Sequence, residues 1–144
     1  MKHYHIMLID DNEGDLFLMN EVLERIVVAE STIIKDGQEA LDFFNDNSCI
    51  PELVFLDINL PKKNGYEVLE FIRNELMLKN IPVIVFSTSS SIEDVMKSYK
   101  GDASVFLTKP VNFDDFEQLV TKAVQFWINY SKLLQENFIG EHQR

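Results

Sequence analysis

Short apolar segments alternate with helix-like segments along the whole chain, and this alternation constrains the fold more than any other feature. The strand-like segments are residues 4–9, 31–34, 53–56, 82–86 and 104–107. Apolar residues at helical spacing follow each of them, at 15–27, 38–44, 66–76, 92–99 and beyond Asn112. Such a pattern predicts an α/β protein with one parallel sheet and helices on both of its faces.

Size and charge narrow the range of functions. The chain has 144 residues, which suits one domain with its own core. Its 24 acidic and 13 basic residues give a net charge of −11. A chain of this charge repels phosphate backbones and anionic lipid, so we expect neither nucleic-acid nor membrane binding. A cation or a partner with a basic surface is the better counterpart.

Several other chemistries are not expected. Cys49 is the single cysteine, so no internal disulfide can form, and this fits a reducing cytoplasm. It stands in a predicted loop without a histidine cluster, so a catalytic thiol is not expected. The sequence has no glycine-rich phosphate loop, and no apolar run approaches the roughly 20 residues of a membrane span. We therefore expect no nucleotide site, signal peptide or transmembrane helix.

Polar residues stand where the predicted strands end. Asp10 and Asp11 follow the first strand, Asp57 the third, Ser87 the fourth and Lys109 the fifth. The carboxyl ends of parallel strands form the ligand crevice of an open α/β sheet. Three carboxylates, a hydroxyl and an ammonium group are thus expected at one rim.

This combination predicts phosphoryl chemistry with a metal ion. Neighbouring carboxylates repel one another unless they take up protons or bind a cation, and their oxygen atoms suit Mg²⁺. One carboxylate can then act as a nucleophile toward a phosphoryl group, while the lysine and the serine hold its other oxygens. Taken singly, each residue is better explained as a turn, a helix cap or an exit from the sheet, but their joint place at four strand ends is not.

The sequence resembles the receiver domains of two-component response regulators over about residues 4 to 129. The matching stretches are IDDNEGD (9–15), LVFLDINLPKKNGYEVL (53–69), IPVIVFSTSS (81–90) and FLTKPVNFDDF (106–116). The ending VQFWINY (124–130) is similar to the small single-domain regulators that are paired with phytochromes. The resemblance implies a doubly wound, flavodoxin-like sheet of five parallel strands in the order 2-1-3-4-5.

The resemblance also implies a role for each site residue. Asp57 would be the phosphoacceptor, with Asp11 as a direct Mg²⁺ ligand and Asp10 as a ligand through water. The backbone carbonyl of Asn59 would also bind the metal, and Ser87 and Lys109 would bind the phosphoryl oxygens. Ser87 and Phe106 would change position on phosphorylation as the switch pair.

Two departures from the family pattern stand out. Ser87 replaces the more usual threonine but keeps the hydroxyl. Asp102 stands where receivers usually have the glycine of a Gly-Ala pair, with Gly101 one place earlier. The loop before the fifth strand is therefore expected to differ in shape.

The function implied is a signalling switch in a phosphorelay rather than a metabolic enzyme. A histidine kinase or a histidine phosphotransfer protein would supply the phosphoryl group, and the switched surface would bind another protein. Two alternatives stay open at this stage. One is an aspartyl-phosphate hydrolase of the haloacid-dehalogenase type, which would need an acid where Asn59 stands. The other is a receiver-like scaffold that takes no phosphate.

The end of the chain exceeds what five strand-helix units need. We predict a receiver domain over 1–129 and a helical extension over 130–144. Tyr130, Leu134 and Phe138 lie near helical spacing, and a lone domain has little surface to cover such a stripe. A homodimer through the fifth helix and this tail is one prediction, and a tail that folds back or frays is the other.

Overall fold

The computed structural model describes residues 4–26, 29–46 and 49–142, without the side chains of Ala29 and of residues 131–142. A sheet of five parallel strands lies in the order β2-β1-β3-β4-β5, as predicted. The strands are β1 (Tyr4–Ile9), β2 (Ala29–Ile34), β3 (Leu53–Leu56), β4 (Val83–Ser87) and β5 (Val105–Thr108). The helices are α1 (Glu13–Ile26), α2 (Gly37–Asp46), α3 (Gly65–Asn74), α4 (Ile92–Lys100) and α5 (Phe113–His142).

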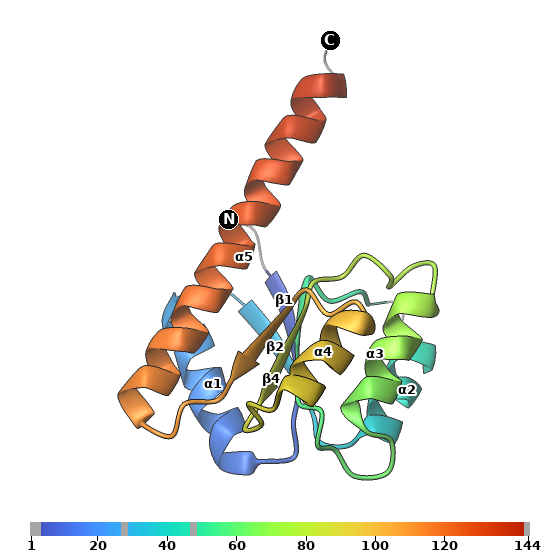
Figure 1. Cartoon of the computed structure of the whole chain (residues 1–144). Coiled ribbons are helices and arrows are strands. Elements are labelled where there is room, and N and C mark those ends of the chain that lie inside the picture. The colour runs from blue at the N-terminus through green and yellow to red at the C-terminus, as the bar shows by residue number, and fades with distance from the viewer. Residues whose placement is uncertain (1–3, 27–28, 47–48, 143–144) are drawn as a thin grey trace.

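Two apolar cores lie on opposite faces of the sheet, which explains why β1, β3 and β4 are almost continuously apolar. On one face, α1 and α5 cover the strands with residues such as Met19, Leu23 and Val120. On the other face, α2 and α3 do so with residues such as Phe44 and Ile72. Figure 1 shows α4 beside α3, and α5 running well past the sheet toward the C-terminus.

The helix boundaries follow from capping groups. The side-chain oxygens of Asn12, Asn64 and Asn112 accept hydrogen bonds from backbone N–H groups in the first turns of α1, α3 and α5. The caps predicted at Asn12 and Asn112 are thus confirmed. The predicted end of α3 at Leu76 is wrong by two residues, because the chain turns after Asn74 and Lys79 N donates to Glu75 O. The predicted end of α1 at Val27 lies outside the described residues.

The loop before β5 places an aspartate in a backbone conformation that is unusual for a residue other than glycine. Asp102 takes a left-handed backbone conformation with φ 70°, whereas Gly101 has φ −79° and ends α4. Arg73 of α3 donates its Nε hydrogen to the Asp102 carbonyl at 2.8 Å. The aspartate therefore occupies the conformation that glycine adopts most easily.

Candidate phosphoacceptor and metal site

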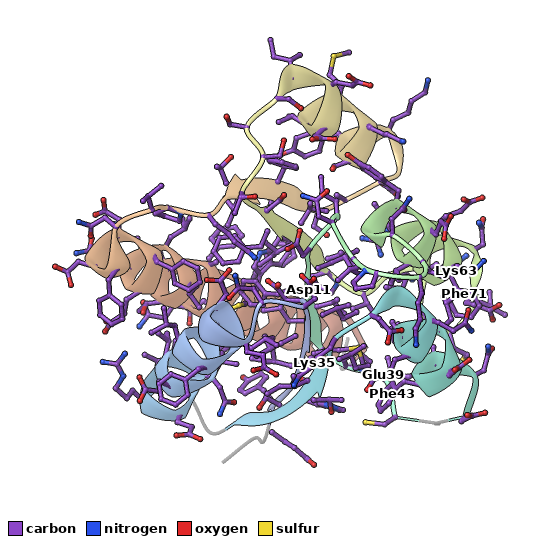
Figure 2. All side chains as sticks on the ribbon, turned by 90° about the horizontal axis from the view of Figure 1, so that it is seen from below. Asp11, Lys35, Glu39, Phe43, Lys63 and Phe71 are labelled. Carbon is purple, nitrogen blue, oxygen red and sulfur yellow. The ribbon has the colours of Figure 1, made fainter. Side chains whose placement is uncertain are left out.

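The residues predicted from the strand ends meet at one edge of the sheet. Asp10, Asp57, Ser87 and Lys109 are all buried there, while Asp11 is exposed. Backbone hydrogen bonds between neighbouring strand ends hold this edge, including Asp57 N to Ile9 O at 2.9 Å and Lys109 N to Ser87 O at 2.6 Å. In Figure 2, viewed toward this edge, Asp11 lies near the centre of the view.

A glycine brings α3 close to the Asp57 backbone. Gly65 begins α3, and its N–H donates to Ile58 O at 3.0 Å. A Cβ atom at this position would lie 2.3 Å from Asp57 O and 2.5 Å from Ile58 Cα. Only glycine allows this approach without movement of the backbone next to Asp57.

The Lys109 ammonium group lies among three carboxylates. Its Nζ donates to Asp10 Oδ2 at 2.6 Å, to Asp15 Oδ2 at 2.9 Å and to Asp57 Oδ2 at 3.2 Å. The other oxygens of the two buried acids accept backbone N–H groups, Asp10 from Asn12 at 2.9 Å and Asp57 from Asn59 at 3.1 Å. The carboxylates are thus fixed in orientation by the backbone, and the lysine offsets part of their charge.

Burial and these bonds shift the protonation equilibria. Burial raises the pKa of the Asp10 carboxyl from 3.8 to about 6, although hydrogen bonds from Lys109 and from the Asn12 N–H lower it. Burial by itself would lower the pKa of Lys109, but its hydrogen bonds to Asp10 and Asp15 raise that pKa well above its usual value. The lysine therefore stays charged, and Asp10 ionises at the cost of desolvation.

The carboxylates of Asp10, Asp11 and Asp57 form a group suited to a divalent cation. One oxygen of each lies within 4.8 Å of the others. Hard oxygen ligands and an exposed side, provided by Asp11, match Mg²⁺, which keeps several waters. The buried excess of negative charge is a further reason for a cation here, because one lysine cannot balance four nearby acids. Receiver domains bind a divalent metal, and these three residues fit that requirement.

The two predicted switch residues lie on neighbouring strands. The Ser87 side chain is fully buried, and its Oγ accepts the Ser89 N–H at 3.2 Å. Phe106 of β5 is half-buried against the core that α2 and α3 cover, and its N–H donates to Tyr99 OH of α4 at 3.0 Å. The Ser87 hydroxyl is therefore linked to the loop before α4, and the Phe106 backbone is linked to α4 itself.

Two features were missed in the sequence. Asp15 was treated only as the beginning of a helix, yet it binds Lys109; its place in the IDDNEGD stretch was the available signal. A polar network was also missed, in which Asp94 of α4 accepts hydrogen bonds from Tyr66 OH at 2.5 Å and from Ser89 Oγ at 2.6 Å. Burial, followed by the hydrogen bond to Asp94, raises the pKa of Tyr66 to about 12. The hydrogen bonds from Ser89 and Tyr66 lower the pKa of Asp94.

A contact between Cys49 and a histidine was also missed in the sequence. His5 Nδ1 lies 2.7 Å from Cys49 Sγ, and His5 Nε2 lies 2.7 Å from Thr32 Oγ1. The pair is separated by 44 residues in the sequence. Only the packing of β1 against the loop before β3 brings the two together.

Comparison with known proteins agrees with this geometry. Residues 6–121 match the response regulator receiver domain family. The chain belongs to this family. It is 39% identical over 129 residues to the response regulator Rcp1 of Synechocystis sp., covering 85% of this chain and 88% of that protein.

Solved receiver structures superpose closely on this one. The phosphorylated cyanobacterial phytochrome response regulator RcpA has a TM-score of 0.85 at 37% identity, covering 88% of this chain and 95% of that one. The Mn²⁺-bound form of Rcp1 has a TM-score of 0.82 at 38% identity, covering 86% and 94%. The receiver fold and the resemblance to small phytochrome-paired regulators are thereby confirmed. The chain is a signalling protein of the response-regulator class, and the hydrolase alternative is set aside.

Proposed function

We propose that Asp57 is the phosphoacceptor of this receiver and that phosphorylation switches a protein-binding surface. The observation that supports it most strongly is the buried Asp57 carboxylate, which shares Lys109 with Asp10 and lies in the cation-binding group. An Asp57 oxygen would form the new P–O bond as the P–N bond of a phosphohistidine breaks, and the imidazole leaves. Hydrolysis by water later returns the carboxylate and releases inorganic phosphate.

Each neighbouring residue has a task in this scheme. Asp10, Asp11, Asp57 and the Asn59 carbonyl would hold Mg²⁺, which supplies positive charge for the phosphoryl oxygens. Lys109 would pair with one of those oxygens, and Ser87 would donate its hydroxyl to another. Ser87 leaves its place beside Ser89 when it does so, which couples the reaction to the loop before α4. The phosphodonor would be a histidine kinase or a histidine phosphotransfer protein. The reaction would take place in a reducing cytoplasm, where the thiol of Cys49 stays free. The chain assists its own phosphorylation and dephosphorylation.

Mass spectrometry after incubation with acetyl phosphate and Mg²⁺ tests the assignment. The wild-type chain should gain one phosphoryl group on Asp57, and Asp57→Asn should gain none. Full labelling of that variant would place the reaction elsewhere.

Asp11→Ala should lose on the order of 100-fold in Mg²⁺ affinity while folding normally, because it removes an exposed metal ligand. An unchanged Mg²⁺ titration would remove Asp11 from the site.

We also propose that the chain forms a homodimer through α5 and the tail beyond residue 129. The helix continues unbroken to His142, and Figure 1 shows its last turns beyond the rest of the fold. Phe126 and Tyr130 are 61% and 46% exposed, and their rings stack with centroids 6.3 Å apart. Exposed aromatic pairs of this kind favour a protein partner. The side chains of Leu134 and Phe138 lie outside the described residues.

Sedimentation of the full chain and of a version ending at Asn129 tests the dimer. The full chain should dimerise at tens of micromolar, roughly the range of a −6 kcal/mol interface, and the shortened chain should not. Beryllofluoride, which mimics a phosphoryl group, should strengthen the association. Monomers in both versions, with and without beryllofluoride, would end the dimer proposal.

A further inference from the structure

The Lys109 ammonium group has a carboxylate partner that the phosphorylation scheme does not use. An ammonium group has three N–H donors. In this structure all three are taken, by Asp10, Asp15 and Asp57 at 2.6, 2.9 and 3.2 Å. A phosphoryl oxygen can bind Lys109 only after one of these partners has released its donor.

Two of the three partners have other tasks in the proposed reaction. Asp10 would help to hold the metal ion, and an oxygen of Asp57 would form the bond to phosphorus. Asp15 is not a member of the cation-binding group formed by Asp10, Asp11 and Asp57 among the described residues. It is therefore the one partner that can stay with Lys109 before, during and after phosphorylation.

We infer that Asp15 is a positioning residue, which holds the Lys109 ammonium at the rim so that its freed donors face the phosphoryl group on Asp57. The inference rests on the proposed role of Asp57. The Lys109 and Asp15 side chains are only 4% and 21% exposed, so their ion pair is partly shielded from water. Asp15 itself is fixed, because its backbone N–H donates to the Asn12 cap of α1 at 2.9 Å.

Positioning matters because a free lysine side chain is flexible. Ordering it costs rotamer entropy, and a partner already in place removes that cost from the reaction step. With Asp10 engaged in holding the metal ion, Asp15 and Asp57 would be the partners left to order the ammonium group. Loss of Asp15 should therefore weaken the contact between Lys109 and the phosphoryl group.

Charge taken alone predicts the opposite effect. Asp15 adds a negative charge near an incoming anionic donor, and its removal would then speed phosphorylation. Two substitutions separate these effects. Asp15→Ala removes both the charge and the hydrogen-bond acceptor, whereas Asp15→Asn removes the charge and keeps an acceptor oxygen for Lys109.

The experiment measures the initial rate of labelling by acetyl phosphate at saturating Mg²⁺, together with beryllofluoride affinity. Asp15→Ala should reduce both by on the order of 10-fold, and Asp15→Asn should lie between that variant and wild type. Glu13→Gln is the matched control, since Glu13 lies in the same helical turn and its carboxylate binds the exposed Lys35 at 2.9 Å. Its labelling should equal that of wild type.

A double-variant comparison shows whether the effect passes through Lys109. In a Lys109→Ala background, Asp15→Ala should cause no additional loss, because the partner that it positions is gone. Wild-type or faster labelling of Asp15→Ala would overturn the inference, as would a full additional loss in the Lys109→Ala background. If the wild-type chain is not labelled on Asp57, the proposed function fails instead, and the two failures are thereby distinguished.

Discussion

The cluster of Asp10, Asp57 and Lys109 and the region formed by α4 and the loops beside it border the same rim of the sheet, yet they are held in place by different contacts. Asp10, Asp57 and Lys109 are buried, and strand-end hydrogen bonds and the close approach of Gly65 fix their backbone. In α4, Ser98 is the one buried residue, whereas Ile92 and Met96 are 76% and 66% exposed.

Polar side-chain contacts take the place of an apolar core under α4. The Asp94 network, the Tyr99 hydroxyl on the Phe106 N–H, and the Lys97 ammonium 4.3 Å from the Tyr66 ring centre link the helix to its neighbours. Elements with few buried apolar contacts open at low free-energy cost. The reacting groups are thus placed on the rigid part of the fold, and the part able to rearrange lies beside them.

The largest expected effect tests the rigidity of the cluster. Gly65→Ala should destabilise the fold by about 3 kcal/mol, because its Cβ would overlap backbone atoms next to Asp57. Gly14→Ala is the control, since the nearest atom to a Cβ there is the Asn12 side-chain oxygen at 3.3 Å. It should change stability by less than about 1 kcal/mol. Urea unfolding measures both. A loss of less than about 1 kcal/mol in unfolding free energy for Gly65→Ala would show that the backbone at this edge of the sheet can move to accommodate the methyl group.

The second prediction concerns the cost of burying charge in the cluster. The pKa of Asp10 is about 6 when folded and 3.8 in an unperturbed chain, so its contribution to stability is present below pH 3.8 and is lost as the pH rises through 6. Without divalent metal, Asp10→Asn should therefore be more stable than wild type at pH 7.5. The gain should be on the order of 2 kcal/mol, since one pKa unit corresponds to about 1.4 kcal/mol.

This gain should shrink toward zero near pH 4, where Asp10 is largely protonated in the folded protein. Mg²⁺ should stabilise wild type more than the variant. Denaturation at several pH values in the presence of a chelator measures the difference, with the exposed Asp114→Asn as a charge control. A variant less stable than wild type at pH 7.5 would mean that the Lys109 pair outweighs desolvation.

The third prediction tests whether the polar network restrains α4. Tyr66→Phe removes the hydroxyl bond to Asp94 and should weaken the attachment of α4 by about 1 kcal/mol. Amide hydrogen exchange in α4 should become faster, and beryllofluoride affinity should rise a few-fold, because Ser89 and its hydrogen-bond partner Ser87 are less restrained. Thr121→Ala, which removes a hydroxyl bond within α5, is the control. Unchanged exchange in α4 would show that this contact does not hold the helix.

The smallest expected effect concerns two residues whose backbone has a left-handed conformation, one in the loop after Asp57 and one in the loop after α4. Lys62, in the loop after Asp57, has φ 67°, and Asp102, before β5, has φ 70°. Glycine relieves this strain, offset in part by its greater freedom in the unfolded chain. Lys62→Gly should stabilise by up to about 1 kcal/mol and Asp102→Gly by less, because aspartate tolerates this conformation better than lysine. Thermal unfolding measures the order, and the reverse order would contradict it.

The sequence was sufficient to predict the sheet because its strands are short, apolar and regularly separated by helical patterns. The convergence of Asp10, Asp57 and Lys109 followed from their place at strand ends. Which side chains pair with one another could not be predicted from the sequence. Asp15 reaches Lys109 from 94 positions away, and nothing in the spacing of either residue indicates the other.

The same limit applies to contacts that depend on loops. Asp94 meets Tyr66 across 28 positions, and His5 meets Cys49 across 44. Such pairs depend on how α4 and the loop before β3 settle on the sheet, which periodicity does not encode. The polar contacts around α4 were missed for this reason, although the helix itself was predicted within one residue of its end.

The length of α5 has a mechanical consequence. At about 1.5 Å per residue, a helix of 30 residues is roughly 45 Å long, and the part beyond Tyr130 accounts for roughly 18 Å. Its first half packs against α1 and the sheet, so the helix acts as a rigid rod that the domain holds along one part of its length. A tilt of about 10° at the packed half would move the free end by about 3 Å relative to the domain surface. A tilt of the packed half would thus be carried along the rod to its far end.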